Sequence, residues 1–409
     1  MRCGLLGKTL GHSYSPQIHA QLGDYSYELF EKQPEELENF LRHGEFDALN
    51  VTIPYKKAVL PYCAVLSDAV KAIGSANTLV RQPDGTLFAD NTDAFGFSCI
   101  ADECGVDIAG KKALVFGSGG ASVTAQYVLK ERGAREVLVI SRTGEHNYEN
   151  LDKNADAEIL VNTTPLGMYP NNGASPADLT RFPRCEAVLD VVYNPARTAL
   201  LLQAEALGIP RAGGLLMLVA QAKRSSELFT GSAIADTRIG EIYRALAVQM
   251  QNIVLVGMPG CGKSSIGTLL AEKLDRPFLD ADAEIEQAAG MPIPDFFKLY
   301  GEAAFRDREQ EAIAALSAVG GQVIATGGGA ILRQENIDAL RQNGTLVFLD
   351  RAPEHLIATA DRPLSADRDS LRRRYEERYD RYCAAANLHI DGNGSVEDTA
   401  RRIEKEWIE

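Results

Sequence analysis

The stretch Asn252-Ile-Val-Leu-Val-Gly-Met-Pro-Gly-Cys-Gly-Lys-Ser-Ser-Ile266 decides the fold of the last third of the chain. Residues 253–256 are apolar and short enough to form a buried strand, and helical apolar spacing resumes at residue 266. Between them, residues 257–264 read Gly-x-x-x-x-Gly-Lys-Ser, the pattern of a phosphate-binding loop. A glycine turn that only links a strand to a helix would need neither the lysine nor the serine. We therefore predict a nucleoside triphosphate site in a parallel α/β domain.

Phosphate binding explains each residue type in this loop. Glycines let backbone N–H groups turn toward phosphate oxygens, and the helix N-terminus adds its dipole. Lys263 offers a cation to the β- and γ-phosphates, and the Ser264 hydroxyl can bind Mg²⁺. The loop residues expected to hold the nucleotide are Gly260, Cys261, Gly262, Lys263, Ser264 and Ser265.

Length and composition bound the rest of the molecule. The chain has 409 residues, which suggests about three domains at roughly 150 residues each. A formal net charge of −14 argues against nucleic acid or an anionic membrane as the main partner. The seven cysteines form no Cys-x-x-Cys pair, and we see no secretion signal and no membrane-spanning run. We expect a soluble cytoplasmic protein, and the sequence is compatible with a homo-oligomer.

Several polar residues of the first hundred stand beside expected strand ends and helix starts. Ser15 precedes Pro16 and can cap a helix there, whereas Ser13 adds a second hydroxyl that could bind a polyhydroxylated acid. Lys56 follows an expected strand at residues 50–53, and Asn77 interrupts a second strand expected at residues 73–80. Asp93 lies at a loop-to-helix junction. Each residue alone also has a simpler interpretation, as a helix cap or a solvated side chain.

Taken together, these pieces resemble the substrate domain of shikimate dehydrogenase in order and spacing. The matching segments are residues 7–19, 50–56, 73–78 and 91–93, and the resemblance extends to about residue 248. It implies that 3-dehydroshikimate or shikimate is held by Ser13, Ser15, Thr52, Asn77 and Asp93, with Lys56 and Asp93 as the catalytic pair. The chemistry agrees, because reducing a ketone leaves an alkoxide that must be protonated or stabilised as it forms.

The middle of the chain carries a dinucleotide-binding pattern. A strand at residues 112–116 ends in a glycine turn, a helix follows, and a second strand is expected at residues 137–140. The turn residues are Gly117, Ser118, Gly119, Gly120 and Ala121. After the second strand stands Arg142 where an acidic residue would favour NAD, so we expect NADP, although Arg142 could be an ordinary surface residue. Ser141 stands where the family usually has asparagine.

The resemblance extends to the end of this region. It implies that Tyr193 and Gln221 touch the substrate and that Val191 and Gly214 lie by the nicotinamide. Without the resemblance, Tyr193 would be a strand-end aromatic residue and Gln221 a polar position on a helix.

Two further patterns support phosphoryl transfer in the last third. A short strand is expected to place Asp280 and Asp282 on one side, one for Mg²⁺ and one for an acceptor hydroxyl, with surface carboxylates as the alternative. The basic run at residues 371–382 suggests RNA at first, but its interleaved acids favour a solvated helix. Arg378 shares the apolar face of this helix, so we expect its guanidinium to bind an anion such as a carboxylate.

Residues 252–409 resemble shikimate kinase in motif order. The resemblance implies that Ser264 binds Mg²⁺ with Asp280 nearby, that Asp282 takes the shikimate hydroxyl, and that Arg362 covers the phosphates. It also implies that the shikimate carboxylate and ring are held by Arg306, Arg378 and Gly328. The family's adenine-stacking arginine is absent, since residues 358–359 are Ala-Thr, and His355 is a candidate substitute.

We therefore expect an α/β protein with three parts. These are a substrate domain at residues 1–98 completed by helices within 213–248, a Rossmann-like NADP domain at 99–212, and a phosphate-loop kinase with a parallel sheet at 252–409. The expected function is NADPH-dependent reduction of 3-dehydroshikimate followed by ATP- and Mg²⁺-dependent phosphorylation of shikimate. One alternative is an NAD-dependent quinate/shikimate dehydrogenase fused to another kinase. The other is a non-catalytic regulator that senses nucleotide and metabolite.

Overall fold

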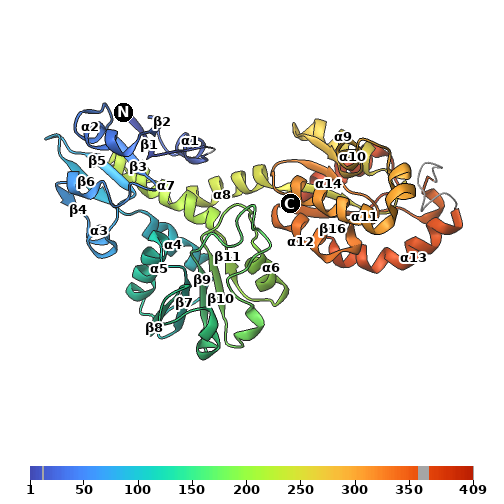
Figure 1. Ribbon diagram of the computed structural model, residues 1–409. Coiled ribbons are helices and arrows are strands. Elements are labelled where there is room, and N and C mark those ends of the chain that lie inside the picture. The colour runs from blue at the N-terminus through green and yellow to red at the C-terminus, as the bar shows by residue number, and fades with distance from the viewer. Residues whose placement is uncertain (12, 358–367, 409) are drawn as a thin grey trace. The chain divides into compact units, whose positions relative to one another are not determined.

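The computed structural model describes residues 1–11, 13–357 and 368–408, and the chain forms two compact units (Figure 1). The first unit comprises Met1–Met168, Ala174–Tyr193 and Gln203–Ala245. The second comprises Tyr169–Gly173, Asn194–Leu202 and Leu246–Glu409, so the division falls inside α8 (Thr237–Met250).

The first sheet of the first unit is six-stranded and mixed. Its order is β2-β1-β3-β5-β6-β4, and β5 runs antiparallel to both β3 and β6. Its strands are β1 (Arg2–Gly7), β2 (Ser26–Glu31), β3 (Ala48–Val51), β4 (Val65–Leu66), β5 (Thr78–Arg81) and β6 (Leu87–Asp90). Three short helices accompany it, namely α1 (Ser15–His19), α2 (Leu37–His43) and α3 (Asp68–Ile73). In this sheet β1 and β3 are parallel neighbours, so the polar segments that follow them emerge at one edge.

The second sheet of this unit is parallel, in the order β11-β10-β9-β7-β8. Its strands are β7 (Lys112–Phe116), β8 (Glu136–Ile140), β9 (Ile159–Asn162), β10 (Ala187–Asp190) and β11 (Arg211–Ala212). The helices are α4 (Asp93–Glu103), α5 (Gly120–Glu131) and α7 (Gly214–Thr230), while α6 (Ala199–Ala206) spans the division between the units. In Figure 1, α4 and α5 lie on one side of this sheet. Helix α4 packs against both α5 and α7, so the helices connect the two sheets of the unit.

The second unit is built on one parallel sheet, in the order β13-β14-β12-β15-β16. Its strands are β12 (Asn252–Val256), β13 (Phe278–Asp280), β14 (Val323–Ala325), β15 (Gly344–Asp350) and β16 (Leu388–Asp391). Its helices are α9 (Lys263–Leu274), α10 (Ala281–Ala289), α11 (Ile293–Ser317), α12 (Gln334–Asn343), α13 (Arg368–Ala385) and α14 (Val396–Ile408). Helix α9 packs against α14 and α11 against α12. Strand β12 is wholly buried, as a continuous apolar run in a parallel sheet requires.

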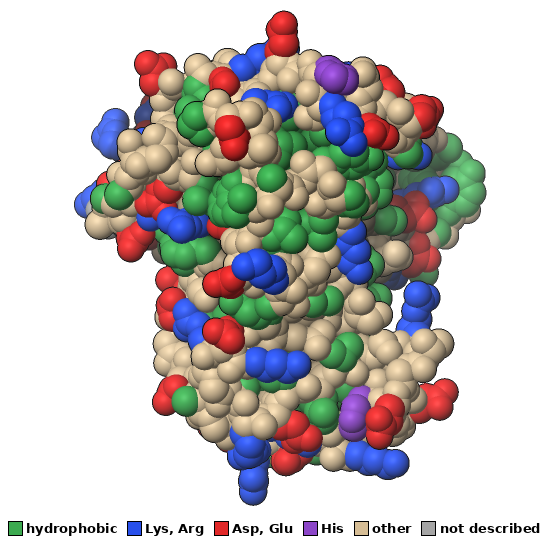
Figure 2. Space-filling view, turned by 90° about the vertical axis from the view of Figure 1, so that its left-hand side faces the viewer, with side chains coloured by type: hydrophobic (Ala, Val, Ile, Leu, Met, Phe, Trp, Pro, Cys, Tyr) green, Lys and Arg blue, Asp and Glu red, His purple; other side chains and the backbone are tan. Residues whose placement is uncertain are grey.

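Two features bear on the partners predicted from the sequence, namely the distribution of surface charge and the hydrophobicity of the helices. On the face shown in Figure 2, Lys and Arg side chains lie among Asp and Glu side chains rather than in one patch. Within the described part of the chain, no helix is both long enough and apolar enough to span a bilayer.

Candidate functional sites

A lysine and an aspartate meet at the edge of the first sheet. Lys56 lies in the turn after β3, and Asp93 is the first residue of α4. Lys56 Nζ lies 2.6 Å from Asp93 Oδ2, and the other carboxylate oxygen accepts a hydrogen bond of 2.9 Å from Asn77 Nδ2. The alternative of Asp93 as a helix cap is wrong, because Thr92 occupies the N-cap position. The pair is only partly exposed, which strengthens its mutual attraction.

Asn77 is placed by the chain around it rather than by a strand. The strand expected at residues 73–80 begins only at Thr78, because Ile73 ends α3 and Gly74 terminates that helix in the left-handed region. Asn77 Oδ1 accepts a hydrogen bond of 2.7 Å from the backbone N–H of Thr92, which turns the amide nitrogen toward Asp93. Gln221 on α7 joins this group, with its Oε1 3.4 Å from Asn77 Nδ2.

The sequence predicts that Ser15 caps α1, but Ser15 is the first residue of that helix and does not cap it. Ser13 Oγ accepts a hydrogen bond of 3.2 Å from the backbone N–H of Ser15. Thr52 follows β3 directly, and its backbone N–H donates to the carbonyl of Leu6 in β1. Ser13 and Thr52 therefore lie on the segments that leave β1 and β3, and Ser15 begins the helix that follows β1.

The expected nicotinamide residues come together where α7 begins. The Gly214 N–H donates to the carbonyl of Val192 at 2.9 Å, and a Cβ at Gly214 would lie 2.1 Å from the carbonyl oxygen of Val191. Only glycine fits there. Tyr193 lies beyond β10, which ends three residues earlier than expected, and its ring meets that of Tyr14 edge-on at 6.3 Å. Burial raises the pKa of Tyr193.

The glycine turn after β7 presents bare backbone at the start of α5. Gly117 has φ +105°, and Gly119 is the N-cap of α5, whose first residue is Gly120. A Cβ at Gly119 or Gly120 would meet no atom within 4 Å, so a phosphate could approach the helix N-terminus closely. Ser118 is exposed and Ala121 lies on the first turn of the helix. Arg142 is exposed just after β8, at the neighbouring strand end.

The phosphate loop of the second unit has the predicted strand–loop–helix form. It runs from β12 to α9, and Gly257, Gly260 and Gly262 all have positive φ. The Lys263 ammonium donates to the carbonyls of Gly257 at 2.9 Å and Met258 at 3.0 Å, and Cys261 is buried as a small filler.

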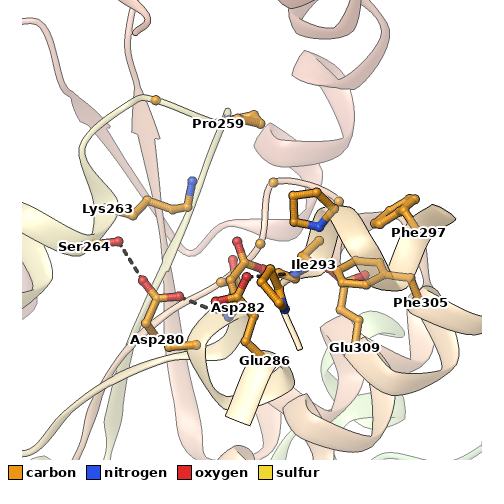
Figure 3. A pocket seen from close by; sticks show the side chains of 18 of the residues that line it. Pro259, Lys263, Ser264, Asp280, Asp282, Glu286, Ile293, Phe297, Phe305 and Glu309 are labelled. Carbon is orange, nitrogen blue, oxygen red and sulfur yellow. Dashed lines mark hydrogen bonds between the residues drawn. The ribbon is translucent and has the colours of Figure 1, made fainter. Parts of the chain in front are cut away.

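This loop opens into a cavity of about 700 Å³ (Figure 3). One end holds Lys263, Ser264 and Asp280, the other holds Phe305 and Glu309, and Asp282 lies between them. The remaining predicted residues in its lining are Gly260, Gly262, Ser265, Arg306, Gly328 and Arg378. Arg362 lies outside the described residues, and His355 bonds Asn393 at 2.9 Å through its Nδ1.

The two aspartates are arranged differently from the expectation. Asp280 ends β13, but Asp282 belongs to α10, so they do not share one side of a strand. The Asp280 carboxylate caps α10 by accepting from the backbone N–H of Asp282, and it also accepts from Ser264 Oγ at 2.6 Å. A hydroxyl beside a carboxylate offers the hard oxygen ligands that Mg²⁺ prefers. In the described residues, no group of three or more His, Cys, Asp and Glu side chains is placed to hold a metal.

Glu309 is a residue of this cavity that the sequence analysis did not single out. Its side chain is 1% exposed, and its Oε2 accepts from Arg306 Nη1 at 2.7 Å. Burial raises the pKa of Glu309, while Arg306 acts in the opposite direction. Both Glu309 and Asp282 face Gly327, where a Cβ would lie within 2.9 Å of a carboxylate oxygen of each. Its spacing of three residues from Arg306 on one helix is the signal that could have revealed it.

The predicted apolar placement of Arg378 on α13 is confirmed. Arg378 is 8% exposed, and its Nη1 donates to the carbonyl of Gly328 at 2.9 Å. Tyr382 donates to the same carbonyl from the next turn of α13. The glycine run after β14 is thereby held from one side by α13, while Arg306 lies against Gly329.

Comparisons with known proteins give matches to both parts of the chain. The model of the shikimate dehydrogenase substrate binding domain matches residues 5–79, and the shikimate kinase model matches residues 259–407. Shikimate dehydrogenase (NADP(+)) of Clostridium perfringens strain SM101 is 32% identical over 264 residues, covering 59% of this chain and 97% of that protein. The corresponding Caldicellulosiruptor bescii protein is 37% identical over 250 residues, covering 53% and 85%.

The solved structures give the same result for the first part of the chain. Shikimate 5-dehydrogenase from Thermus thermophilus, in complex with NADP(H) and shikimate, matches with a TM-score of 0.55 and 33% identity. The match covers 60% of this chain and 99% of that one. The chain therefore belongs to the shikimate dehydrogenase family and carries a shikimate kinase domain in its C-terminal part.

Proposed function

We propose that this chain catalyses two successive reactions on one cyclohexene acid. The first is reduction of 3-dehydroshikimate to shikimate with NADPH, and the second is phosphorylation of shikimate with ATP. A single observation supports this most strongly: one chain holds a lysine–aspartate pair and a dinucleotide-type glycine turn in its first unit, and a phosphate loop opening onto arginines and carboxylates in its second. We assign residues 1–98 with helices of 213–248 to the substrate domain, 99–212 to the NADP domain, and 252–409 to the kinase.

In the first reaction, NADPH supplies the hydride, and the chain's own residues bind and stabilise the carbonyl oxygen of the substrate. The Lys56 ammonium, held by Asp93, hydrogen-bonds the carbonyl oxygen and stabilises the negative charge that develops on it. The alkoxide left by hydride addition takes a proton from the lysine–aspartate pair and becomes a hydroxyl, and solvent returns a proton to the pair. The substrate's other oxygens are assigned to Ser13, Ser15, Thr52, Asn77, Tyr193 and Gln221. The dinucleotide is assigned to the Gly117–Ala121 turn, Arg142, Val191 and Gly214.

In the second reaction, the ends of the cavity hold the two substrates. ATP, whose γ-phosphoryl group is transferred, is assigned to the phosphate loop with Lys263, and the carboxylate of shikimate to Arg306 and Arg378. Asp282 lies between the two ends, where it can accept the proton of the attacking hydroxyl. Ser264 and Asp280 would hold Mg²⁺, because a hydroxyl and a carboxylate are oxygen ligands that this ion prefers. The ion would neutralise phosphate charge. Cytoplasmic location and a homo-oligomer stay predictions from sequence.

One combined assay tests the proposal. The full chain is supplied with 3-dehydroshikimate, NADPH, ATP and Mg²⁺, and the products are separated by chromatography. We expect shikimate 3-phosphate, with NADPH consumed in equal amount. Omitting ATP should stop the sequence at shikimate, and omitting NADPH should leave 3-dehydroshikimate unchanged. Binding of both ligands without turnover would instead favour the regulator, and preferential use of NADH with quinate would favour the alternative dehydrogenase.

A further inference from the structure

Helix α7 contributes a second polar side chain one turn beyond Gln221. Ser225 is completely buried, and it does not belong to the residues assigned to substrate or cofactor. Buried hydroxyls need hydrogen-bond partners, so the partners of Ser225 show what it holds together.

Four elements of the first unit meet at the Ser225 hydroxyl. Its Oγ lies 2.8 Å from Asn50 Nδ2, 2.9 Å from Thr78 Oγ1 and 2.9 Å from Thr92 Oγ1. It also donates to the carbonyl of Gln221, one turn earlier in the same helix, at 3.0 Å. These partners belong to β3, β5, the start of α4 and α7, so one oxygen connects the strands with both helices.

The hydrogen-bonding capacity of a serine gives most of these contacts a direction. A hydroxyl has one hydrogen and two lone pairs. The Gln221 carbonyl can only accept, so it receives the Ser225 hydrogen. The amide oxygen of Asn50 accepts from the Tyr27 hydroxyl at 2.8 Å, so its nitrogen faces Ser225. An amide nitrogen can only donate. The second lone pair of Ser225 is therefore left for a threonine hydroxyl, Thr78 or Thr92.

The network continues from Ser225 to the catalytic pair. Thr92, whose hydroxyl lies 2.9 Å from Ser225 Oγ, donates its backbone N–H to Asn77 Oδ1 at 2.7 Å. Asn77 Nδ2 then donates to Asp93 Oδ1 at 2.9 Å, and Asp93 Oδ2 holds Lys56. Thr92 also precedes Asp93 directly. Hydrogen bonds that fix the position of Thr92 therefore also fix the position of the first turn of α4.

We propose that Ser225 is a positioning residue for the reductase site, which sets the Asn77 amide and the start of α4 so that the Asp93 carboxylate faces Lys56. This inference rests on the proposed roles of Lys56 and Asp93. A bond to the carbonyl four residues earlier is common for helical serines and alone would have no functional consequence. Here it uses only the hydrogen of Ser225, and both lone pairs serve other elements.

The neighbouring residue provides a matched control. Ser226 is equally buried on the same helix, but its hydroxyl donates to the carbonyl of Leu22 at 3.4 Å. Among the described residues, the hydroxyl of Ser226 makes no direct hydrogen bond to Thr92, Asn77 or Asp93. Ser226→Ala should therefore reproduce the general cost of removing a buried hydroxyl from α7 without the change at the site.

The experiment compares Ser225→Ala and Ser226→Ala in the full chain, measuring kcat and KM for 3-dehydroshikimate. Ser225→Ala should lower kcat by about tenfold, with KM changed less than about threefold, as for an interaction that acts mainly in the transition state. Ser226→Ala should leave kcat and KM unchanged. Phosphorylation of added shikimate should stay normal in both variants and reports an intact second unit.

Two further results keep the inference separate from the proposed function. Absence of reductase activity in the unsubstituted chain would count against the proposed function, whereas equal kcat values of Ser225→Ala and Ser226→Ala would overturn only the role of Ser225. Should Ser225→Ala fail to fold, Thr92→Val removes the next hydroxyl of the same path and must lower kcat with little change in KM. A Thr92→Val enzyme with an unchanged kcat would also overturn the proposal.

Discussion

The two sites of this chain hold their charges in different ways. The reductase site has one partly exposed ion pair, Lys56 with Asp93, and it is oriented by neutral amides and hydroxyls such as Asn77 and Thr92. The kinase site instead gathers several charges around a glycine run, with Glu309 almost wholly buried against Arg306. Amides and hydroxyls orient the first ion pair without adding charge, whereas a guanidinium and a carboxylate balance each other out of water in the second site. The first site is therefore prearranged by neutral groups, and the second is organised by charges.

The largest effects should come from removing one working lysine at each site. Lys56→Ala should lower 3-dehydroshikimate reduction by roughly 10³-fold and leave phosphorylation of added shikimate intact. Lys263→Ala should lower phosphorylation by at least about 10²-fold and let shikimate accumulate. Both rates are measured on each purified variant. Two exposed lysines serve as controls: Lys57→Ala, at the position after Lys56, and Lys273→Ala, in α9. Loss of both activities in either variant would contradict the separation of the sites.

The buried glutamate tests whether charge, rather than shape, organises the kinase site. Glu309→Gln keeps the volume but removes the buried anion of the Arg306 guanidinium, which then pairs only with the more exposed Glu302, so kcat/KM for shikimate should fall by roughly 30-fold or more. KM for ATP should change little, because the phosphate loop is at the other end of the cavity. Steady-state kinetics with each substrate varied in turn will show this. Glu311→Gln, an exposed glutamate with the same spacing to Arg308, should behave as unsubstituted enzyme. An equal rise in KM for ATP would refute the assignment.

Arg142 tests cofactor choice at the prearranged site. Arg142→Met should raise KM for NADPH by about tenfold, since an exposed arginine contributes only part of a charged hydrogen bond to the 2′-phosphate. KM for NADH, which lacks that phosphate, should stay within about twofold on the same reasoning. Initial rates with both cofactors decide between these outcomes. Arg181→Met, a surface arginine paired with Asp152, is the control, and a parallel rise for NADH would mean that Arg142 only supports the loop.

The smallest effect on activity at neutral pH should come from His19, which is stacked on Tyr27 and accepts or donates a hydrogen bond with the Tyr25 hydroxyl. Burial lowers the pKa of His19 to about 3, against 6.5 unperturbed. Between these values the unfolded chain binds the additional proton, so stability falls as pH falls from 6.5 toward 3. The loss is about 1.4 kcal/mol per pH unit at most.

Urea unfolding followed by reductase activity at several pH values measures this dependence. His19→Gln should flatten the loss of stability below pH 6.5, whereas the exposed His43→Gln should not. An unchanged pH dependence in His19→Gln would show that other groups dominate acid unfolding of the first unit. It would also weaken the view that this unit depends on buried neutral groups.

The sequence predicted residue types better than the elements that carry them. The phosphate loop was recognised with its strand and helix because three successive features follow one another within fifteen residues. Asp282 was expected on a strand and lies on a helix, since Asp280 caps α10 and ends β13 early. The sequence predicts that Ser15 caps α1, but Ser15 is the first residue of that helix and donates its own N–H to Ser13. A cap depends on the backbone path before the helix, and residue preference alone does not determine that path.

The sequence alone predicts three local patterns: the Gly-x-x-x-x-Gly-Lys-Ser loop, the glycine turn of a βαβ unit, and the arginine on an apolar helix face. These depend on neighbours within a few turns of chain. Two other arrangements depend on tertiary contacts. Ser225 is linked to Asn77 through Thr92, and Glu309 and Asp282 both face Gly327. Such contacts join residues far apart in the chain. They exist because packing buries polar groups that must then find partners wherever the fold places them.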